Sequence, residues 1–534
     1  MNSRRLRAPR DDQAVLAVPP LDQATKLIET NQRALRDQTH NFQGRAFDVL
    51  RARARAEVMT AAREQLTSLG ASLPSRHWDP ESPAPLVVSG HQPELFHAGV
   101  WIKNFAVGAI ADRAAGVPIH LVVDNDLPKS AGIRVPRVAG TTLRSRTIEF
   151  EDTQPEVPFE AWRSHNSRLF HSFRQRVVDQ LGGLVSAPII DEFWPIAKQI
   201  MDEDPRLGRA FAGARRLYEQ RWGLRSWDLP MSKVCDGDAF RWFLSHILAH
   251  LPRFHQIHNA ALASYRATNR IRSHNHPVAN LGRVDDWLEA PVWVWHVDRP
   301  RRLPLLVRAR GRVTEIRAGR NGDKPVELRL SPDTDACCAV ERLAEWHAAG
   351  WRIRTRALTT TMFARLFLSD LFIHGIGGAK YDELGDEIMR AFFGFEPPAF
   401  LTLSMTVWLG MNDYPSTEAA LAQARRLVRD LAHNPDRHLA APIKHEVESL
   451  LLEKRDAIAA PTLTRRERIA RWRRLHDVNA RLRPHVAELQ TQALERVRSL
   501  EAIESWNRAA HARDYSFVLH DPAHLRAAYA QATA

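Results

Sequence analysis

A short polar segment follows an apolar run near residue 90 and carries the first side chains that could do chemistry. The run ends at Ser89, and the chain continues with Gly90, His91 and Gln92. A glycine lets the backbone approach a ligand closely, and a histidine exchanges a proton near neutral pH. We expect His91 to act as a general acid or base and Gly90 and Gln92 to bind substrate. The alternative is a plain turn in which the imidazole only satisfies backbone groups.

A second histidine follows six residues later and is also a candidate. His97 begins the sequence His-Ala-Gly-Val, which matches three of the four positions of the His-x-Gly-His loop found in nucleotide-binding enzymes. The fourth residue is Val100 rather than histidine. We expect His97 to bind substrate, and transfer of a nucleotidyl group remains an alternative reaction.

Acidic residues follow a second apolar run and could bind a polar ligand. They are Asp124 and Asp126, with Asn125 between them and Lys129 three residues later. Carboxylates at the end of a parallel strand can bind an amine, a sugar hydroxyl or a metal–phosphate complex. We expect Asp124 and Asp126 to be catalytic and Asn125 and Lys129 to bind substrate. The alternative is an Asx turn that caps the next segment.

Three glycines within four residues form the third candidate segment, which follows another apolar run. Such a segment can cradle a phosphate or another substrate group between a strand and a helix, although the spacing is not that of a Walker loop. The expected substrate-binding residues are His374, Gly375, Gly377, Gly378, Lys380 and Tyr381. The alternative is a helix-capping turn that needs glycine for its backbone angles.

The elements that would hold these segments follow an alternating pattern. Apolar runs at 86–88 and 119–123 predict buried strands, and the spacing of apolar residues over 99–115 predicts a helix between them. Such a strand–helix–strand unit gives a parallel sheet with a right-handed crossover. Helices expected at 360–371 and 380–394 surround a further strand that leads into His374. We therefore predict an α/β fold with a Rossmann-like parallel core.

The remaining regions differ in pattern from this core. Residues 11–72 and 160–265 show helical periodicity, including a helix from Phe240 to Leu251 that Pro252 would close. Short apolar runs over 290–330 predict a small antiparallel sheet. A helix is expected over 335–349 and a strand over 353–357. Tryptophans in this part, expected to pack or to stack on a base or sugar, are Trp287, Trp293 and Trp295.

The sequence after residue 416 predicts helices almost throughout. Apolar residues at spacings of three and four over 463–503, interrupted by Pro484, predict a helical hairpin or short coiled coil. A homodimer through these helices is a further expectation. The chain then divides into an N-terminal helical segment, the first half of the core, a helical insertion with the small sheet, the second half of the core, and this C-terminal region. Their bounds are 1–85, 86–160, 161–332, 333–415 and 416–534.

Composition and charge limit the classes of partner. The chain has 534 residues, 44% of them hydrophobic, and lacks an apolar run of about 18 residues, so we expect no membrane span and a cytoplasmic protein. The net charge of +13 comes from arginines spread along the chain and mixed with acidic residues, as at 465–468. This pattern favours an anionic small substrate over a dedicated nucleic-acid partner.

Metal-binding patterns are missing from the sequence. The cysteines lack C-x-x-C spacing and are expected to be reduced and buried. The histidines that could suggest a metal site do not have the spacing of a helical metal pair, and no metal is expected. These residues are Cys235, Cys337, Cys338, His255, His258, His274, His276 and His296.

The three candidate segments resemble those of the bacillithiol-biosynthesis BshC family of putative cysteine-adding enzymes. The turn at 89–96 is similar to the family's G-Q/H-Q-x-G-L-F turn, and 123–126 is similar to its acidic E-D-H-D motif. The glycine segment at 376–381 is similar to its G-G-P-G-E turn and precedes a Phe-Glu-Pro-Pro stretch at 395–398. The chain departs from the family at Asn125, where the family has histidine, and at 379–381, where it has Pro-Gly-Glu.

The resemblance implies a Rossmann-like core, a C-terminal coiled coil and a ligase or transferase activity. In the family, cysteine is condensed with a sugar–malate acceptor, and a bound ATP or ADP is compatible with this chemistry. The resemblance covers about 86–130 and 356–405, so this chain is expected to be a divergent member that acts on another acceptor. A nucleotidyl-transferring enzyme and a non-catalytic basic protein that binds nucleic acid or assembles with partners are the alternatives.

Overall fold

The computed structural model divides the chain into two compact units, each of which is described by itself. The larger unit comprises Met1–Val135, Thr147–Leu409 and Arg513–Ala534, and the smaller comprises Pro136–Arg146 and Gly410–Ala512. The residues that the structure describes are 6–140, 142–153, 156–273, 276, 278–320, 324–415, 417–442 and 444–534.

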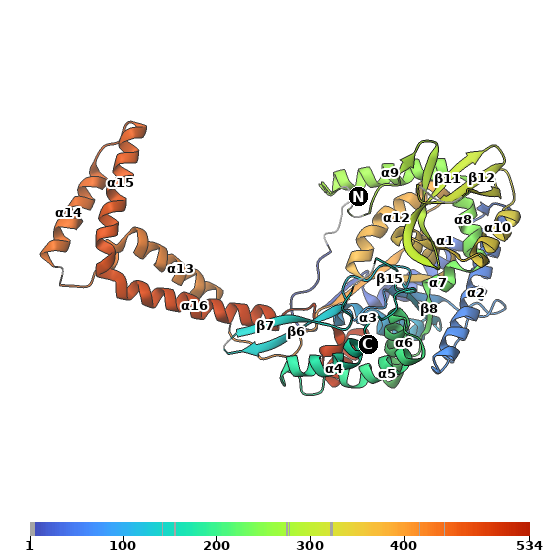
Figure 1. Cartoon of the computed structure of the whole chain (residues 1–534), viewed down its shortest axis with the longest axis horizontal. Helices are drawn as coiled ribbons and strands as arrows, with labels where there is room; N and C mark the ends of the chain where they lie inside the picture. Colours follow the sequence, from blue (N-terminus) through green and yellow to red (C-terminus); the bar gives the residue numbers. More distant parts are fainter. Residues whose placement is uncertain are drawn as a thin grey trace. The chain divides into compact units, whose positions relative to one another are not determined.

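A six-stranded sheet lies at the centre of the larger unit (Figure 1). Its order is β1-β16-β15-β4-β5-β8; β1 is antiparallel to β16, and all other neighbours are parallel. The strands are Val15–Val18 (β1), Leu86–His91 (β4), Val117–Val122 (β5), Trp227–Pro230 (β8), Leu371–His374 (β15) and Phe400–Met405 (β16). The strands expected from the apolar runs at 86–88 and 119–123 are confirmed, as is the mixed α/β class.

Helices follow the parallel strands as the sequence pattern predicts. Helix α3 (Ala98–Arg113) connects β4 to β5 and is almost wholly buried, because it packs against β4, β5 and β16. Helix α12 (Ile376–Phe393) follows β15 directly. It begins four residues before the expected start, so Gly377 and Gly378 lie inside its first turn.

A second sheet is antiparallel and matches the expectation for 290–330. Its order is β13-β12-β11-β10-β14, with β9 paired to β10. The strands are Arg283–Val284 (β9), Trp287–His296 (β10), Arg299–Arg310 (β11), Val313–Ala318 (β12), Val326–Arg329 (β13) and Trp351–Thr355 (β14). Strand β14 pairs with β10 rather than with the parallel strands. This pairing brings Thr355 and Arg356 near the end of β5.

The N-terminal region is helical with short interruptions by extended chain. Helices α1 (Ala24–Arg36) and α2 (Phe47–Ser68) are confirmed, but β1 precedes them and a small hairpin of β2 (Asn41–Phe42) and β3 (Arg45–Ala46) separates them. The remaining helices of the larger unit are η1 (Leu21–Gln23), α4 (Ser167–Leu181), α5 (Ile190–Glu203), α6 (Leu207–Arg221), α7 (Met231–Cys235), α8 (Asp238–Ala249), α9 (Leu251–Thr268), α10 (Cys337–Ala348), α11 (Ala357–Phe363), η2 (Ala364–Leu368), η5 (Phe517–Leu519) and α17 (Pro522–Thr533).

The role expected for Pro252 is wrong. The helix predicted over Phe240–Leu251 ends at Ala249, and Pro252 lies in the first turn of α9 instead of closing α8. The first turn of a helix leaves its N–H groups unpaired, so a proline is tolerated there. The helical character of this region is therefore confirmed, but the proline belongs to the helix that follows.

One continuous apolar core joins the two sheets of the larger unit. It includes Val88 of β4 and Leu121 of β5, together with Val292 of β10 and Ile316 of β12. The core fixes the antiparallel sheet beside the parallel one, so residues of β11 and β14 lie close to the ends of the parallel strands. This arrangement positions the candidate site.

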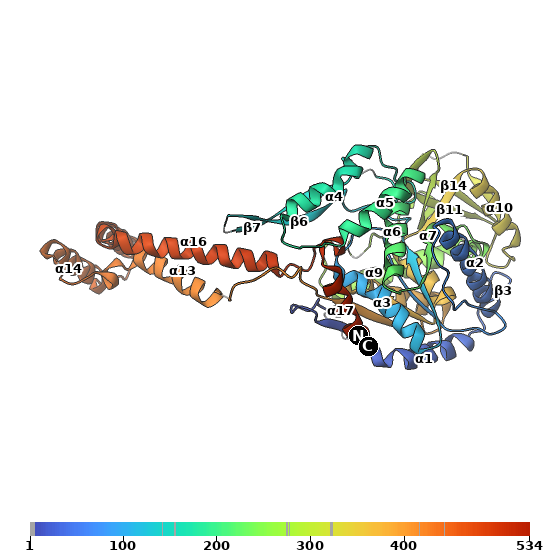
Figure 2. The ribbon, with the colours of Figure 1, turned by 90° about the horizontal axis from the view of Figure 1, so that it is seen from below.

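The smaller unit consists of helices and of the tip of the β6–β7 hairpin (Gly132–Ala139 and Thr142–Glu149). Helix α13 lies beside α16 (Figure 2), and α14 lies beside α15 (Figure 1). The helices are α13 (Glu418–His433), η3 (Pro435–His438), α14 (His445–Ala459), α15 (Arg465–Leu482), η4 (Arg483–Val486) and α16 (Ala487–Ala510). The expected helical hairpin is present, and Pro484 lies at the break between α15 and α16. A homodimer through these helices stays a prediction.

Across the described ranges, the structure contains no helix that is both long and apolar enough to cross a membrane.

Of the three cysteines, Cys235 is buried, whereas Cys337 and Cys338 are exposed, contrary to the expectation that all three are buried.

Candidate active site at the carboxyl edge of the sheet

The three candidate segments lie at the ends of neighbouring parallel strands. Ile373 of β15 pairs with Ser89 of β4, and His91 of β4 pairs with Val122 of β5. The segment around Gly90 therefore lies between the glycine-rich segment on one side and the acidic segment on the other. We call these three strand ends the carboxyl edge. Segments almost 300 residues apart in the chain meet there, as the sequence pattern predicts.

Lys103 is the most unusual side chain at this edge, and the sequence reasoning missed it. Its residue is only 3% exposed, and its Nζ donates to the carbonyl oxygen of Gly90 at 2.9 Å. Burial lowers the pKa of the Lys103 ammonium to about 8. Among the ion pairs of the described chain, none includes Lys103. A buried ammonium without a counter-ion is unfavourable until an anion reaches it.

The positive charge of Lys103 acts on several imidazoles around it. After burial, it is the largest cause that lowers the pKa of His91, and it contributes to lowering the pKa values of His97, His120 and His374. His91 and His374 end their strands, His120 lies within β5, and His97 is the N-cap of α3. The only sequence sign of Lys103 is a lone lysine inside the buried stretch that begins at Trp101.

His91 is half-buried and held in one protonation form. Its Nδ1 lies 3.1 Å from the carbonyl oxygen of Gln92, which can only accept a hydrogen bond, so Nδ1 carries the hydrogen. Burial lowers the pKa of His91 well below its ordinary value, and the ring is neutral at pH 7. The Nε2 atom therefore has a free lone pair. This geometry fits a general base and does not fit a cationic anion donor.

His374 forms a buried pair with a carboxylate that the sequence reasoning did not identify. Its Nε2 donates to Asp382 at 2.6 Å, and Asp382 also accepts from Arg365 at 2.9 Å and from Thr361 at 2.6 Å. Burial would raise the pKa of Asp382, but the charges of His374 and Arg365 lower it below its usual range. Asp382 stays ionised and fixes the ring of His374. No sequence signal links these residues, because they come from a strand end and from the second turn of a helix.

The glycines after His374 do not serve the backbone angles of a capping turn. Gly375 is the N-cap of α12 with φ −79°, and neither it nor Gly377 or Gly378 has a positive φ. A side chain at Gly378 would begin 2.7 Å from Nδ1 of His374, whereas Gly375 and Gly377 face open space. The first N–H groups of α12 are therefore not covered by side chains of these residues. Such a helix start favours an anion.

The last two residues of the glycine-rich segment point elsewhere. Lys380 is exposed. Tyr381 is half-buried against the apolar core, and its ring lies 6.2 Å from that of His276. The structure therefore brings His374 and the glycines to the carboxyl edge but gives Tyr381 a packing role.

Two of the acidic-segment residues are turned into the interior. Asp124 accepts from the backbone N–H of Ser232 at 2.8 Å and from its hydroxyl at 2.6 Å, and so caps the short helix α7. Burial and the charge of Glu160 raise the pKa of Asp124 to about 7. Asn125 donates to the carbonyl oxygen of Thr355 at 2.9 Å. Both side chains are thus used in long-range structural contacts rather than in an Asx turn that caps the next segment.

Asp126 instead links the edge to the antiparallel sheet. It accepts from Gln92 at 2.9 Å and from Arg302 of β11 at 2.9 Å. The guanidinium of Arg302 lies 5.0 Å from the ring centre of Trp293, and that of Arg356 lies 3.8 Å from it. Trp293 therefore contacts two arginines, and Gln92 is held by a carboxylate that already has a cationic partner.

Lys129 and His97 lie at the margins of the edge. Lys129 is largely exposed, with its Nζ 3.8 Å from Glu94. His97 is the N-cap of α3, burial lowers its pKa to about 4, and its Nδ1 is buried without a partner. Gly99 is needed for packing, since a side chain there would meet the carbonyl oxygen of Met405. The two residues that match the His-x-Gly-His pattern, His97 and Gly99, therefore have structural roles as the helix N-cap and as a packing residue.

No model of a known protein family and no curated protein matches the chain. Over the ranges that the structure describes, no group of three or more His, Cys, Asp or Glu side chains is arranged to hold a metal ion. Among the histidines considered in the sequence, His274 lies outside the described residues.

Proposed function

We propose that this chain is an enzyme with a Rossmann-like core that binds a small anionic substrate at the carboxyl edge. The observation that carries the proposal is Lys103, a buried ammonium beside Gly90 with no carboxylate partner in the described chain. The uncovered start of α12 and the neutral ring of His91 are its neighbours along the same edge. An anion between them would receive an ion pair and backbone hydrogen bonds at once.

The reaction that fits these groups best is the ligase reaction suggested by the resemblance to the BshC family. An amino acid, cysteine in that family, would be joined through a new C–N bond to a sugar-type acceptor. ATP, bound as a second substrate, would activate the carboxyl group and supply the phosphate-containing leaving group. The amine nitrogen of the acceptor would attack the acyl carbon while Nε2 of His91 takes its proton. Lys103 would hold the substrate's carboxylate or the oxyanion that forms during attack.

The departures from the family pattern support a different acceptor. Asn125, which replaces the family's histidine, is bonded to Thr355 and leaves no titrating group at that position. Lys380 is exposed and Tyr381 packs in the core where the family has a Pro-Gly-Glu turn. We infer that the amino-acid side of the site resembles the family and that the acceptor side differs.

The proposal is tested by ligand-induced thermal stabilisation of the full chain. Cysteine, an aminosugar–malate conjugate and ATP are added singly and together, and mass spectrometry follows the condensed product and the nucleotide released. His91→Ala should remove product formation, and Lys103→Met should remove the stabilisation by the acid. Lys26→Met, an exposed lysine on α1, is the matched control and should behave as the parent.

The results of these experiments distinguish the proposed ligase reaction from nucleotidyl transfer. Product formation that survives His91→Ala, or stabilisation that survives Lys103→Met, would remove the catalytic assignment. Release of pyrophosphate with the nucleotide transferred to the acceptor, and no C–N product, would favour the nucleotidyl-transfer alternative instead.

A further inference from the structure

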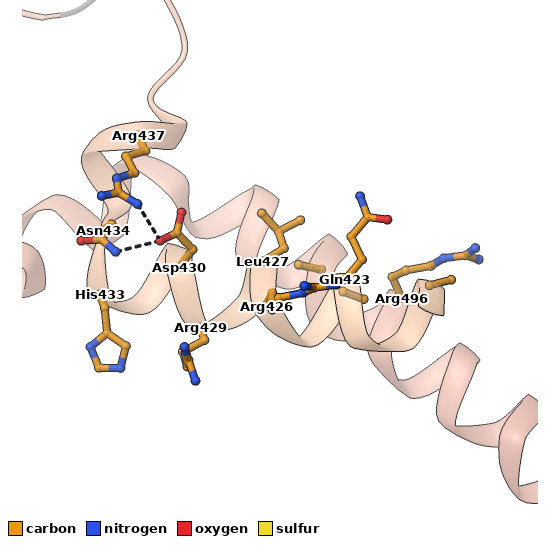
Figure 3. A pocket seen from close by; sticks show the side chains of 12 residues that line it. Gln423, Arg426, Leu427, Arg429, Asp430, His433, Asn434, Arg437 and Arg496 are labelled. Atoms are coloured by element: carbon orange, nitrogen blue, oxygen red, sulfur yellow. Dashed lines mark hydrogen bonds and ion pairs between the residues drawn. The ribbon is translucent and has the colours of Figure 1, made fainter. Parts of the chain in front are cut away.

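The smaller unit carries a basic groove that the proposed reaction does not use. It has a volume of about 950 Å³ and runs along α13 between that helix, η3 and α16. Figure 3 shows Arg496 near one end and Arg437 near the other. Its polar lining residues are Gln423, Arg426, Arg429, Asp430, His433, Asn434, Arg437 and Arg496.

Most of the positive charge in this groove has no carboxylate partner. Arg426, Arg429 and Arg496 are exposed, and among the ion pairs of the described residues none includes them. The groove's one carboxylate, Asp430, already accepts from Asn434 at 2.7 Å, from His438 at 2.8 Å and from Arg437 at 3.4 Å. The groove therefore presents net positive charge along its length.

Some basic residues elsewhere in the same unit are paired with carboxylates. Arg425, which directly precedes Arg426, pairs with Glu501 at 2.7 Å. Arg481 pairs with Glu453 at 2.9 Å. The groove arginines Arg426, Arg429 and Arg496 lack such pairing within the described part of the unit, as do several exposed arginines of α15. What distinguishes the groove arginines is that they line one hollow along α13.

We propose that this groove binds the phosphate backbone of a nucleic acid strand. The groove follows α13 from Ala420 to His433, which is about 20 Å at the helical rise per residue. That length spans roughly six phosphates of a stacked strand. The arginines are spread along it and exposed, so they match a linear polyanion better than a compact metabolite, whose ligands would converge and be buried. The lining holds no Phe, Tyr or Trp side chain on which bases would stack, so we infer that the backbone is read rather than the base sequence.

A second basic region of the smaller unit, in α15, serves as a control. In α15 the side chain of Glu467 is bound in the capping box of Thr464. The nearby Arg466, Arg468 and Arg473 are exposed. They lie outside the groove but in the same unit, so their removal changes the net charge equally without touching the proposed site.

Fluorescence anisotropy with the full chain tests the proposal, using a labelled 20-nucleotide RNA and the DNA strand of the same sequence. The groove variant carries Arg426→Gln, Arg429→Gln and Arg496→Gln. It should lose affinity at least tenfold at 0.1 M salt, and the slope of log K against log salt should fall by about 2, as expected for three lost contacts to a single strand. Equal binding of RNA and DNA supports backbone reading, and preference for RNA would add contacts to its 2′-hydroxyls.

The α15 variant, with Arg466→Gln, Arg468→Gln and Arg473→Gln, should keep most of the affinity and slope. Equal losses in both variants would mean general attraction to net charge and would overturn the groove assignment. So would binding to vesicles with anionic lipids but not to either strand. Lys103→Met should leave strand binding unchanged, so the groove and the proposed enzymatic site can fail independently. Circular dichroism checks that both variants keep their helices.

Discussion

The two units hold unneutralised positive charge in opposite ways. Lys103 in the larger unit is a single ammonium, 3% exposed, whose Nζ donates to the carbonyl oxygen of Gly90. The groove of the smaller unit spreads exposed guanidinium groups along one helix. Burial makes the first charge unfavourable in itself and sensitive to protonation, because the ammonium has lost its hydration. Exposure makes the second charge harmless to folding but strongly dependent on salt.

Two paired arginines complete the comparison. Arg365 is 1% exposed and bound to Asp382 at 2.9 Å and to Asp386 at 2.7 Å. Arg425 is largely exposed and bound to Glu501. Lys103 is buried and unpaired, the groove arginines are exposed and mostly unpaired, Arg365 is buried and paired, and Arg425 is exposed and paired. The effects of burial and of pairing can therefore be compared independently. Burial should set the size of a substitution's effect on stability, and pairing should set its sign.

The largest effect is expected at the buried, paired cation. Arg365→Met should lower the free energy of unfolding by about 3–5 kcal/mol, because Asp382 and Asp386 lose a buried partner. Urea denaturation measures the change. Arg390→Met, which removes a partly exposed arginine of α12 paired with Glu396, is the control and should change stability little. A similar small change in both variants would mean that burial does not set the size.

The opposite sign is expected at Lys103. Lys103→Met should raise the free energy of unfolding by about 1–4 kcal/mol at pH 7, because an unpaired buried charge is replaced by an apolar chain of similar length. The folded pKa of about 8 lies below the ordinary value of 10.5, so the unfolded chain binds more protons between these values and the parent gains stability as pH rises. The advantage of the variant should therefore be largest below pH 8 and disappear towards pH 10. A loss of stability at pH 7 would mean that the ammonium serves packing instead.

Binding at the two regions should respond to different variables. Affinity for an anionic substrate at the carboxyl edge should fall about tenfold per pH unit above 8, since the Lys103 ammonium is lost there. Strand binding in the groove should stay constant to pH 10, because arginine remains charged. Titration calorimetry and anisotropy over pH 7–10 measure both. Parallel losses would show that one charge type governs both regions.

Much of the fold follows from local patterns in the sequence. The strands near Val88 and Leu121 and the helix between them are apolar runs of the right length and spacing, so they could be predicted. The partner of β14 could not, because a short strand carries no mark of the sheet it joins. The same holds for the role of Pro252, which depends on where the neighbouring helix ends.

The candidate site was only partly visible in the sequence for a related reason. Polar residues directly after strands, such as His91 and His374, could be found because strand ends are where parallel sheets bind ligands. Asp382 and Lys103 lie on helices, and only packing turns them towards the edge. Asp124 looked catalytic by its position, yet its oxygens are used by Ser232. In each case, the direction of the side chain, rather than its position in the sequence, determines whether the residue belongs to the candidate site.

The smallest effect is expected at the exposed, paired Arg425. Arg425→Gln should change the free energy of unfolding by at most about 1 kcal/mol, as is usual for surface ion pairs. It should weaken RNA binding less than threefold, since Arg425 does not line the groove and Glu501 already neutralises it. Glu501→Gln should do the reverse: it frees Arg425 beside the groove and should steepen the salt slope by up to about 0.7, one added contact. If Arg425→Gln weakened binding as much as Arg426→Gln alone, the strand would not be confined to the groove residues.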